Sequence, residues 1–301
     1  MQNIPSEKVY RECFTANDFI NTDYSSQESR IIAEKSGDQN MIDFFVKGNE
    51  TFGSDLHSFT ATKMYRVLRD EPDLVVSKKT HPEERNNAKA LGFKLVYGGS
   101  AFTLKDDFGV DIDVAEKFIE AYLDAFPGLR SFFSRQKKNA LRNGYVDIDR
   151  TGRRWYCPFM DEMNDAKEKA SSYYPEEYRS WDSQTKQEFK DELKKNHPEL
   201  KDLWSTYFTL RGKLERAALN YAIQGAAGSM SKQAGILIRR YLLDNPIGVQ
   251  TNIVHDETCA ESEQAEILAP IIKQCMEDAG KLICDHITMT AEPVISLTWQ
   301  H

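Results

Sequence analysis

The sequence predicts an α+β fold in which helices dominate and a few short strands carry acidic residues. Long stretches show amphipathic helical patterns, whereas the strand-like segments lead into polar turns that contain carboxylates. The 301 residues, of which 40% are hydrophobic and 29% charged, suffice for one large domain or two small ones. No apolar run reaches about 18 residues, so no transmembrane helix is expected.

Composition also limits the compartment and the partners. The N-terminal residues lack the basic and apolar regions of a signal peptide. The five cysteines are scattered and form no CxxC pair. We therefore expect a cytoplasmic protein that is neither secreted nor bound to a membrane. The net charge of −8 excludes a globally basic nucleic-acid binder, so any polyanion must meet local positive patches.

The first third of the chain is predicted to hold one strand and several helices. Residues 20–34 have the pattern of a strand, a turn and a helix, and residues 41–65 are helical in pattern with interruptions at glycines. Pro82 suits a first helical turn. A helix is therefore expected from there to Tyr97, where the pair Gly98–Gly99 ends it.

The middle of the chain contains further helices and a hairpin. Residues 113–143 show two amphipathic helices separated by a Pro-Gly break, and residues 144–158 alternate about a turn, which predicts a β-hairpin. Residues 161–213 are dense in Asp, Glu and Lys, with Trp and Tyr at intervals. They are expected to form a solvated helical insertion whose charged surface carries no chemistry.

The last third is predicted to contain a long helix followed by a small strand unit. Residues 213–243 are helical in pattern, with small side chains where a backbone or ligand could approach closely. Residues 249–261 indicate two strands about a tight turn. A helix over residues 263–284, bent or broken at Pro270, and a strand near residues 294–297 complete the chain.

Two aspartates form the first candidate site. Asp23 and Asp256 each follow apolar strand-like residues and precede polar turns. Carboxylates on adjacent strands can hold two Mg²⁺ ions about 4 Å apart, a geometry that serves phosphoryl transfer. Aspartates at such positions are also common as turn residues or helix caps, so the pattern alone leaves both interpretations open.

The second and third candidates are side-chain stripes on helices. Arg85, Lys89, Phe93 and Tyr97 recur every four residues, so they share one face that is cationic at the N-terminal end and aromatic at the other. Such a face could bind phosphate and stack on a base, or it could simply bury its aromatic residues under exposed charges. The same spacing relates Arg216, Asn220 and Gln224, which could contact base edges or form a solvated helix face.

A basic segment is the fourth candidate. Between Arg130 and Arg154, basic residues far outnumber the two acidic ones, Asp147 and Asp149. Such a patch could neutralise phosphates, although a solvated face would account for it equally.

The motifs DYSSQESR, RNNAKALGFKLVYGGSAF, RAALNYAIQG and VHDE, in this order, resemble the successive motifs of family A DNA polymerases, the bacterial DNA polymerase I type. Further landmarks are QNIP at 2–5, DLH at 55–57, GYV with TGRR within 144–154, and the terminal WQH. The resemblance covers nearly the whole chain except residues 161–213. It implies a polymerase right-hand fold with a small antiparallel palm sheet and a mainly helical fingers subdomain.

The resemblance also implies a role for each matching residue. Asp23 and Asp256 would be catalytic metal ligands, with the Tyr24 carbonyl as a further ligand and Glu257 as an auxiliary catalytic carboxylate. Six residues would bind the nucleotide. Glu28 would select deoxyribose, and His57, Arg85 and Lys89 would bind the triphosphate. Phe93 would stack on the nucleotide, and Tyr97 would lie near the template base. The residues that contact DNA would be Arg216, Asn220, Gln224 and His255.

The implied activity is template-directed DNA synthesis, in which a primer 3′-hydroxyl attacks the α-phosphate of a dNTP and pyrophosphate leaves. Two Mg²⁺ ions, replaceable by Mn²⁺, are the implied cofactor, and primer–template DNA is the implied partner. One alternative is a non-catalytic remnant that binds DNA or a partner, which would have no need of paired carboxylates. Another is a single-subunit RNA polymerase, which Glu28 opposes because RNA synthesis needs room at the 2′ position.

The resemblance divides the chain into four parts. They are the first part of the palm (1–65), the fingers with the helix 82–97 and the hairpin (66–160), the charged insertion (161–213) and the second part of the palm (214–301). Thumb and exonuclease domains are expected to be absent, so that the chain is either a fragment or is completed by a separate polypeptide. The expected location is the cytoplasm of a bacterium or of a virus-infected cell.

The sequence departs from the family pattern at two places within these motifs. Lys94 stands where glycine is usual, and Ser26-Gln27 shifts the usual glutamine by one position.

Overall fold

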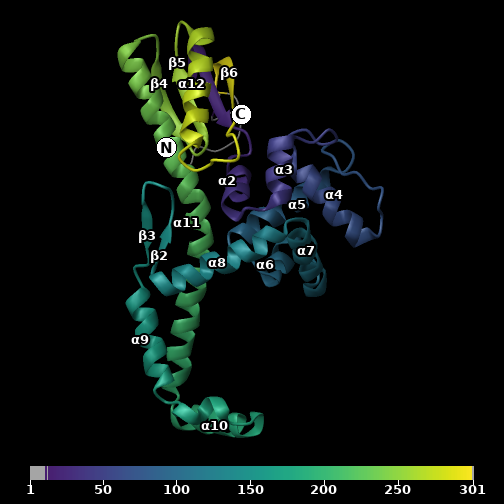
Figure 1. Ribbon diagram of the computed structural model, residues 1–301, viewed down its shortest axis with the longest axis vertical. Helices are drawn as coiled ribbons and strands as arrows, with labels where there is room; N and C mark the ends of the chain where they lie inside the picture. The colour runs from purple at the N-terminus through teal and green to yellow at the C-terminus, as the bar shows by residue number, and fades with distance from the viewer. Residues whose placement is uncertain (1–10, 12, 300–301) are drawn as a thin grey trace.

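The computed structural model describes residue 11 and residues 13–299. The QNIP landmark and the last two residues of WQH lie outside the described residues. Figure 1 shows an elongated molecule in which a small sheet lies at one end, a group of helices projects from the middle and a helical arm extends to the other end. One long helix, α11, runs through most of this length. The expected α+β class with a small antiparallel sheet is confirmed.

The sheet contains four antiparallel strands in the order β4-β5-β1-β6. Their bounds are Thr15–Tyr24 (β1), Val249–Val254 (β4), Glu257–Glu261 (β5) and Ala291–Thr298 (β6). Helix α12, Ala265–Gly280, packs against β1 and β6 and also against α11. The strands predicted before Asp23, around the 255–257 turn and near residue 294 are all present.

Helix α12 runs through Pro270 as one helix, so of the two expected outcomes, a bend or a break, the break is absent. Proline removes one backbone hydrogen bond from a helix interior. Leu268 and Ile272 on either side of it are completely buried. Their burial offsets the lost hydrogen bond and holds the segment helical.

Seven helices follow β1 and build the largest part of the core. Their bounds are Gln27–Ser36 (α2), Gln39–Lys47 (α3), Leu56–Arg69 (α4), Pro82–Val96 (α5), Ala101–Phe108 (α6), Ile112–Ala125 (α7) and Pro127–Asn143 (α8). Helix α6 was not predicted; it is short and begins with a capping box between Ser100 and Thr103. Phe126, Leu129 and Phe132 are fully buried where α7 and α8 meet.

A hairpin and the arm complete the fold. Strands β2, Tyr145–Asp147, and β3, Arg154–Tyr156, form the predicted hairpin. The hairpin packs on α11 through Trp155, whose ring stacks on Tyr221 at 4.6 Å between centroids.

The arm, residues 161–213, consists of most of α9, a short 3₁₀ helix, α10 and the first part of α11. The bounds are Met160–Ser171 (α9), Glu176–Ser180 (η1), Ser183–Asn196 (α10) and Glu199–Asp244 (α11). Helix α11 has 46 residues, which corresponds to roughly 70 Å. The expected boundary at residue 213 therefore falls inside one continuous helix. The arm has its own small core of Ala170, Leu193 and Leu200.

Among the described residues, no helix has both the length and the apolar character needed to cross a membrane.

Candidate active site

Asp23 is near the end of β1, and Asp256 lies in the turn between β4 and β5 at the same end of the sheet. Asp23 is paired with Glu257 in the β1–β5 register, and the Tyr24 amide donates a hydrogen bond to the Asp256 carbonyl at 3.3 Å. Both aspartates are half-buried, and the Oδ1 atom of Asp23 is shielded from solvent. The structure thus places the two aspartates that the sequence singled out on neighbouring stretches of backbone.

The turn that carries Asp256 has an unusual backbone. His255 adopts a left-handed conformation with φ of 54°, which costs a residue with a side chain roughly 1–2 kcal/mol. Ser231 of α11 donates a hydrogen bond from Oγ to the His255 carbonyl at 2.8 Å, and Gln27 of α2 donates to the same Oγ at 3.4 Å. Two helices therefore hold the turn in place. Sequence reasoning missed Ser231, although it lies seven residues, or two helical turns, after Gln224.

Glu257 lies beside Asp23 in the register but has a different environment. Its carboxylate accepts two hydrogen bonds from Arg11 Nη1, at 2.9 and 3.0 Å, one from Asn21 Nδ2 at 3.1 Å and one from Trp299 Nε1 at 3.3 Å. Burial alone would raise its pKa, but the Arg11 and Asn21 hydrogen bonds outweigh burial and lower it. Glu257 is thus an ionised, clamped group, and its direct catalytic role stays a prediction.

The Glu28 side chain on α2 interacts with residues from the end of α5, from α11 and from the turn that carries Asp256. Tyr97, which follows α5, donates a hydrogen bond from its hydroxyl to Glu28 Oε2 at 2.7 Å. Burial raises the pKa of Glu28, and the negative charge of Asp256 raises it further. Hydrogen bonds from Tyr97 and from Gln224 of α11 act in the opposite direction but do not cancel the rise. Asp256 at the end of the sheet and Tyr97 at the C-terminal end of α5 therefore both act on Glu28.

The predicted triphosphate ligands gather between α4 and α5. Arg85 donates from Nε and Nη2 to the two carboxylate oxygens of Asp55, at 2.8 and 3.0 Å. Burial would raise the pKa of Asp55, but the Arg85 hydrogen bonds outweigh it and lower the pKa to about 2. Burial, together with the positive charges of Lys89 and Arg85, lowers the pKa of His57 to about 4. His57 is therefore neutral at pH 7 beside two cations. Sequence reasoning did not identify Asp55 as the partner of Arg85, although DLH was noted as a landmark.

An aromatic row continues from this cluster along α5. The His57 and Phe93 ring centroids are 6.0 Å apart, and the rings of Phe93 and Tyr97 lie nearly parallel, 18° between their planes and 6.4 Å between centroids. The row joins the Arg85 and Lys89 region to Glu28. It would offer a planar surface for stacking beside a cationic region.

The stripe on α11 lies against the end of α5. Gly98 has φ of +80°, and a Cβ there would come within 2.8 Å of Arg216 Cγ. Only glycine therefore permits this close approach. Asn220 and Gln224 follow Arg216 at intervals of one helical turn. Arg216 and Gln224 are exposed, and Asn220 is half-buried. The structure places this stripe beside Tyr97 and Glu28.

The basic segment and Lys94 make contacts within the chain. Arg130 pairs with Glu120 and Asp124, Arg150 with Asp285, and Arg154 with Asp147. Much of the positive charge that the sequence suggested for phosphates is therefore neutralised internally. Lys94 forms an ion pair with Asp107 of α6, which gives the unusual residue a structural partner.

The donor set at the strand ends suits a hard divalent cation. Asp23, Asp256 and the Tyr24 carbonyl are oxygen ligands, and Mg²⁺ in phosphoryl-transfer sites takes one or two carboxylates plus substrate phosphates. Within the described part of the chain, no group of three or more His, Cys, Asp or Glu side chains forms a metal site on its own. The site therefore fits a cation whose remaining ligands come from backbone and substrate.

Comparison with known proteins gives consistent matches over the chain. The model of DNA polymerase family A matches residues 1–301. DNA polymerase I of Streptococcus pneumoniae (strain ATCC BAA-255 / R6) is 28% identical over 312 residues, covering 99% of this chain and 29% of the relative. The thermostable DNA polymerase I of Thermus aquaticus is 28% identical over 287 residues, covering 92% and 27%.

A solved structure is also similar. It is the POL domain of Pol1 from M. smegmatis in complex with DNA primer-template and dNTP, with a TM-score of 0.73 and 25% identity, covering 99% of this chain and 44% of that one. The chain spans less than a third of the length of the curated relatives it matches.

The Asp55–Arg85 pair predicts a pH-dependent stability difference. Asp55→Asn keeps an oxygen to cap α4 at Ser58 but removes the charge opposite Arg85. The folded-state pKa of about 2 lies below the ordinary 3.8, so the charge stabilises the fold above about pH 4, and this contribution is lost as pH falls through 2. We expect the variant to be less stable at pH 7 by up to about 1 kcal/mol, measured by urea denaturation.

This difference should shrink below pH 4 and disappear near pH 2. Asp43→Asn, at an exposed ion pair on α3, is the control and should change little. An Asp55→Asn difference that is the same at pH 7 and at pH 2.5 would show that the charge is not responsible.

His57 offers a second, local test. Its ring should titrate near pH 4 in an NMR experiment, and the free energy of unfolding should fall as pH drops from about 6.5 towards 4, because the unfolded state binds the proton more readily. Lys89→Met removes a positive charge and should raise this midpoint, whereas Lys63→Met, on α4 with His57, should not. A midpoint near the ordinary 6.5 in the parent chain would refute the arrangement of His57 beside Lys89 and Arg85.

Proposed function

The chain belongs to DNA polymerase family A, and we propose that it catalyses template-directed DNA synthesis, adding dNTPs to a primer 3′-hydroxyl with release of pyrophosphate. The observation that carries this proposal is the meeting point at Glu28. There, Asp256, in the turn next to Asp23 of β1, and Tyr97, at the end of the helix bearing Arg85 and Lys89, both act on one carboxylate. Such an arrangement joins metal ligands to triphosphate ligands, as nucleotidyl transfer requires.

Two Mg²⁺ ions, or Mn²⁺ in their place, are the cofactor that the donor set fits. Asp23, Asp256 and the Tyr24 carbonyl would hold them. When bound, such ions lower the pKa of the attacking hydroxyl and offset charge on the leaving pyrophosphate. The β1–β5 pairing sets Asp23 opposite Glu257, and the Tyr24 amide donates a hydrogen bond to the Asp256 carbonyl, so the backbone at that side of the site would need little reorganisation when substrate arrives.

The triphosphate would be bound by the side chains between α4 and α5. Arg85 presents two guanidinium N–H groups, now bonded to Asp55, that suit phosphate oxygens as well as carboxylate. Lys89 supplies a second charge on the same face. His57, neutral at pH 7, can donate one ring N–H to a phosphate oxygen without adding a third positive charge.

The base, the sugar and the DNA would be bound by the remaining predicted residues. Phe93 would stack on the incoming nucleotide, and Tyr97 would lie near the template base. Glu28, held by Tyr97, would fill the space that a ribose 2′-hydroxyl needs. The primer–template would be contacted by Arg216, Asn220, Gln224 and His255.

The parts of the chain take their proposed roles from this site. Residues 1–65 and 214–301 would form the palm and residues 66–160 the fingers, with residues 161–213 as an addition. We propose that a thumb from a separate polypeptide completes the grip on duplex DNA. Adding such a polypeptide to the chain should then lengthen the products of primer extension.

Asp256→Asn tests the metal assignment. We expect primer extension, measured on a short primer–template with Mg²⁺ or Mn²⁺, to fall by roughly three orders of magnitude, because one carboxylate is worth several kcal/mol of charge stabilisation. Asp244→Asn, at the exposed end of α11, is the matched control and should leave extension unchanged. Unfolding by urea should be similar in both variants. Extension by Asp256→Asn at the rate of the parent chain would refute the assignment.

Glu28→Ala separates a DNA polymerase from a single-subunit RNA polymerase. The substitution opens the space beside Tyr97, so incorporation of rNTPs should rise by at least roughly tenfold relative to dNTPs, measured with single-nucleotide additions. Tyr97→Phe, which keeps the ring but releases the carboxylate, should give a smaller change in the same direction. A parent chain that already uses rNTPs as readily as dNTPs would support the RNA polymerase alternative instead.

A further inference from the structure

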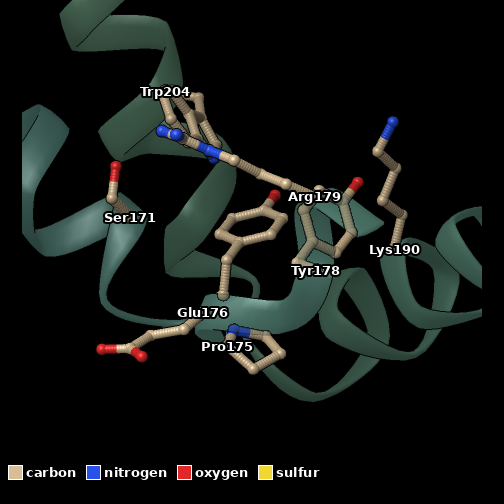
Figure 2. Close-up of a pocket in the computed structure, with 8 residues that line it drawn as sticks. Ser171, Pro175, Glu176, Tyr178, Arg179, Lys190 and Trp204 are labelled. Carbon is tan, nitrogen blue, oxygen red and sulfur yellow. The ribbon is translucent and has the colours of Figure 1, made fainter. Parts of the chain in front are cut away.

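The outer end of the arm carries a concave surface that the proposed polymerase site does not use. Two hollows, of about 640 and 570 Å³, lie between the 3₁₀ helix, α10 and the start of α11. They share Tyr174, Lys190 and Trp204, so they adjoin one another. Figure 2 shows the first of them. Each hollow has the volume typical of small-molecule sites in proteins. We call this region the aromatic–basic surface.

Aromatic side chains line this surface without being buried in the arm's core. That core consists of Ala170, Leu193 and Leu200, whereas Tyr174, Tyr178 and Trp204 remain partly exposed around it. The Tyr174 ring contacts Tyr178 and Trp204 edge-on, at 5.0 and 6.2 Å between centroids. Partly exposed, fixed rings are suited to stacking on planar ligands.

The charge of the lining is strongly biased towards positive. Its charged side chains are Arg179, Lys190, Lys194 and Lys201, with Glu176 as the carboxylate. Over the residues that the structure describes, no ion pair involves Arg179, Lys190 or Lys201, and Lys194 lies 3.5 Å from Asp191. Glu199, on the neighbouring turn, is bonded to Tyr173 and His197 instead. Asp191 offsets part of the charge of Lys194 and Lys190, whereas Arg179 and Lys201 form no ion pair with any described residue.

Cations and rings line the same surface. Arg179 and Trp204 line the first hollow together, and in the view of Figure 2 the Arg179 side chain extends in the direction of Trp204 while Lys190 lies beyond Tyr178. Leu193, Pro198 and Leu200 make part of the second hollow apolar, but the lining as a whole carries cations as well as rings. Partly exposed rings next to cations match the bases and phosphates of a flexible polynucleotide.

We propose that the aromatic–basic surface binds single-stranded DNA, with bases stacked on Trp204 and Tyr174 and phosphates paired with Arg179, Lys190 and Lys201. Given the proposed polymerase function, this strand is the unpaired template. The surface lies at the end of the molecule remote from the sheet (Figure 1), so it would hold the template at a distance from the metal ligands.

The test uses the whole chain and a fluorescein-labelled oligodeoxythymidine of about 12 nucleotides. Trp204→Ala should weaken binding by roughly tenfold, as expected when one stacked base is lost. The double variant Lys190→Ala/Lys201→Ala should lower the slope of log affinity against log salt by about 1.4, since each lost phosphate contact contributes about 0.7. Lys195→Ala, on α10 but outside both hollows, is the matched control and should bind as the parent does.

A local readout separates this surface from DNA contacts elsewhere on the chain. An oligonucleotide that contains 5-iododeoxyuridine should crosslink on irradiation to the peptides that carry Tyr174 or Trp204, as identified by mass spectrometry. Crosslinks confined to other regions would overturn the proposal. So would unchanged affinity in both the Trp204 and the lysine variants. Because the exposed lysines do not support the arm's core, their double variant remains informative even if Trp204→Ala unfolds the arm.

Two further measurements distinguish the alternatives. A poly-glutamate peptide that binds as tightly as the oligonucleotide and is equally sensitive to Trp204→Ala would indicate an acidic protein partner and overturn the assignment to DNA. In an Asp256→Asn background, oligonucleotide binding at the arm should persist although extension is lost. If the parent chain extends no primer but crosslinks at Trp204, the proposed catalysis fails while the binding surface stands. If it extends primers normally without these crosslinks, the binding proposal alone fails.

Discussion

The pairing of β1 with β5 is the constraint on which the rest of the site depends. Hydrogen bonds between the backbones set Asp23 opposite Glu257 and bring the Asp256 carbonyl to the Tyr24 amide. Because side chains in a strand alternate between faces, a slip of one residue would turn one carboxylate away from the other. The register is protected from such a slip by the complete burial of Ile20 and Thr22 in β1. The turn itself is held from outside by α2 and α11, through Gln27 and Ser231.

The carboxylates around this turn show how one small region can keep groups of the same type in different states. Glu257 is buried, but the guanidinium of Arg11 keeps its pKa low. Glu28 is buried with a neutral donor and a nearby like charge, so its pKa is raised. Asp55, further out, is held ionised by Arg85. The surroundings of each carboxylate rather than its residue type therefore set its pKa, and the guanidinium groups that lower the pKa of Glu257 and Asp55 belong to the chain itself.

Local signals in the sequence predicted much of this arrangement, and contacts between distant segments account for what they missed. Apolar residues before Asp23 and about the 255–257 turn gave the strands, and Pro82 with the glycine pair gave the bounds of α5. Helix α6 was missed because it is short and starts directly after those glycines. The Arg11–Glu257 clamp joins residues 246 positions apart, and the arm's exposed rings depend on how α10 folds back on α11. No periodicity or motif carries such information.

The continuity of α11 has a mechanical consequence. Its inner half is fixed by buried residues such as Ile223 and Ala226 against the body, while its outer half stands clear with only the arm around it. An unbroken helix of this length behaves as a stiff rod, since every internal peptide bond is tied to the next turn. A small change in the angle of α11 where it packs on the body produces a large displacement of its outer end. A force on the outer end likewise acts as a torque on the part of the helix that carries Gln224 and Ser231. The arm is thus a lever whose fulcrum lies next to the strand-end carboxylates.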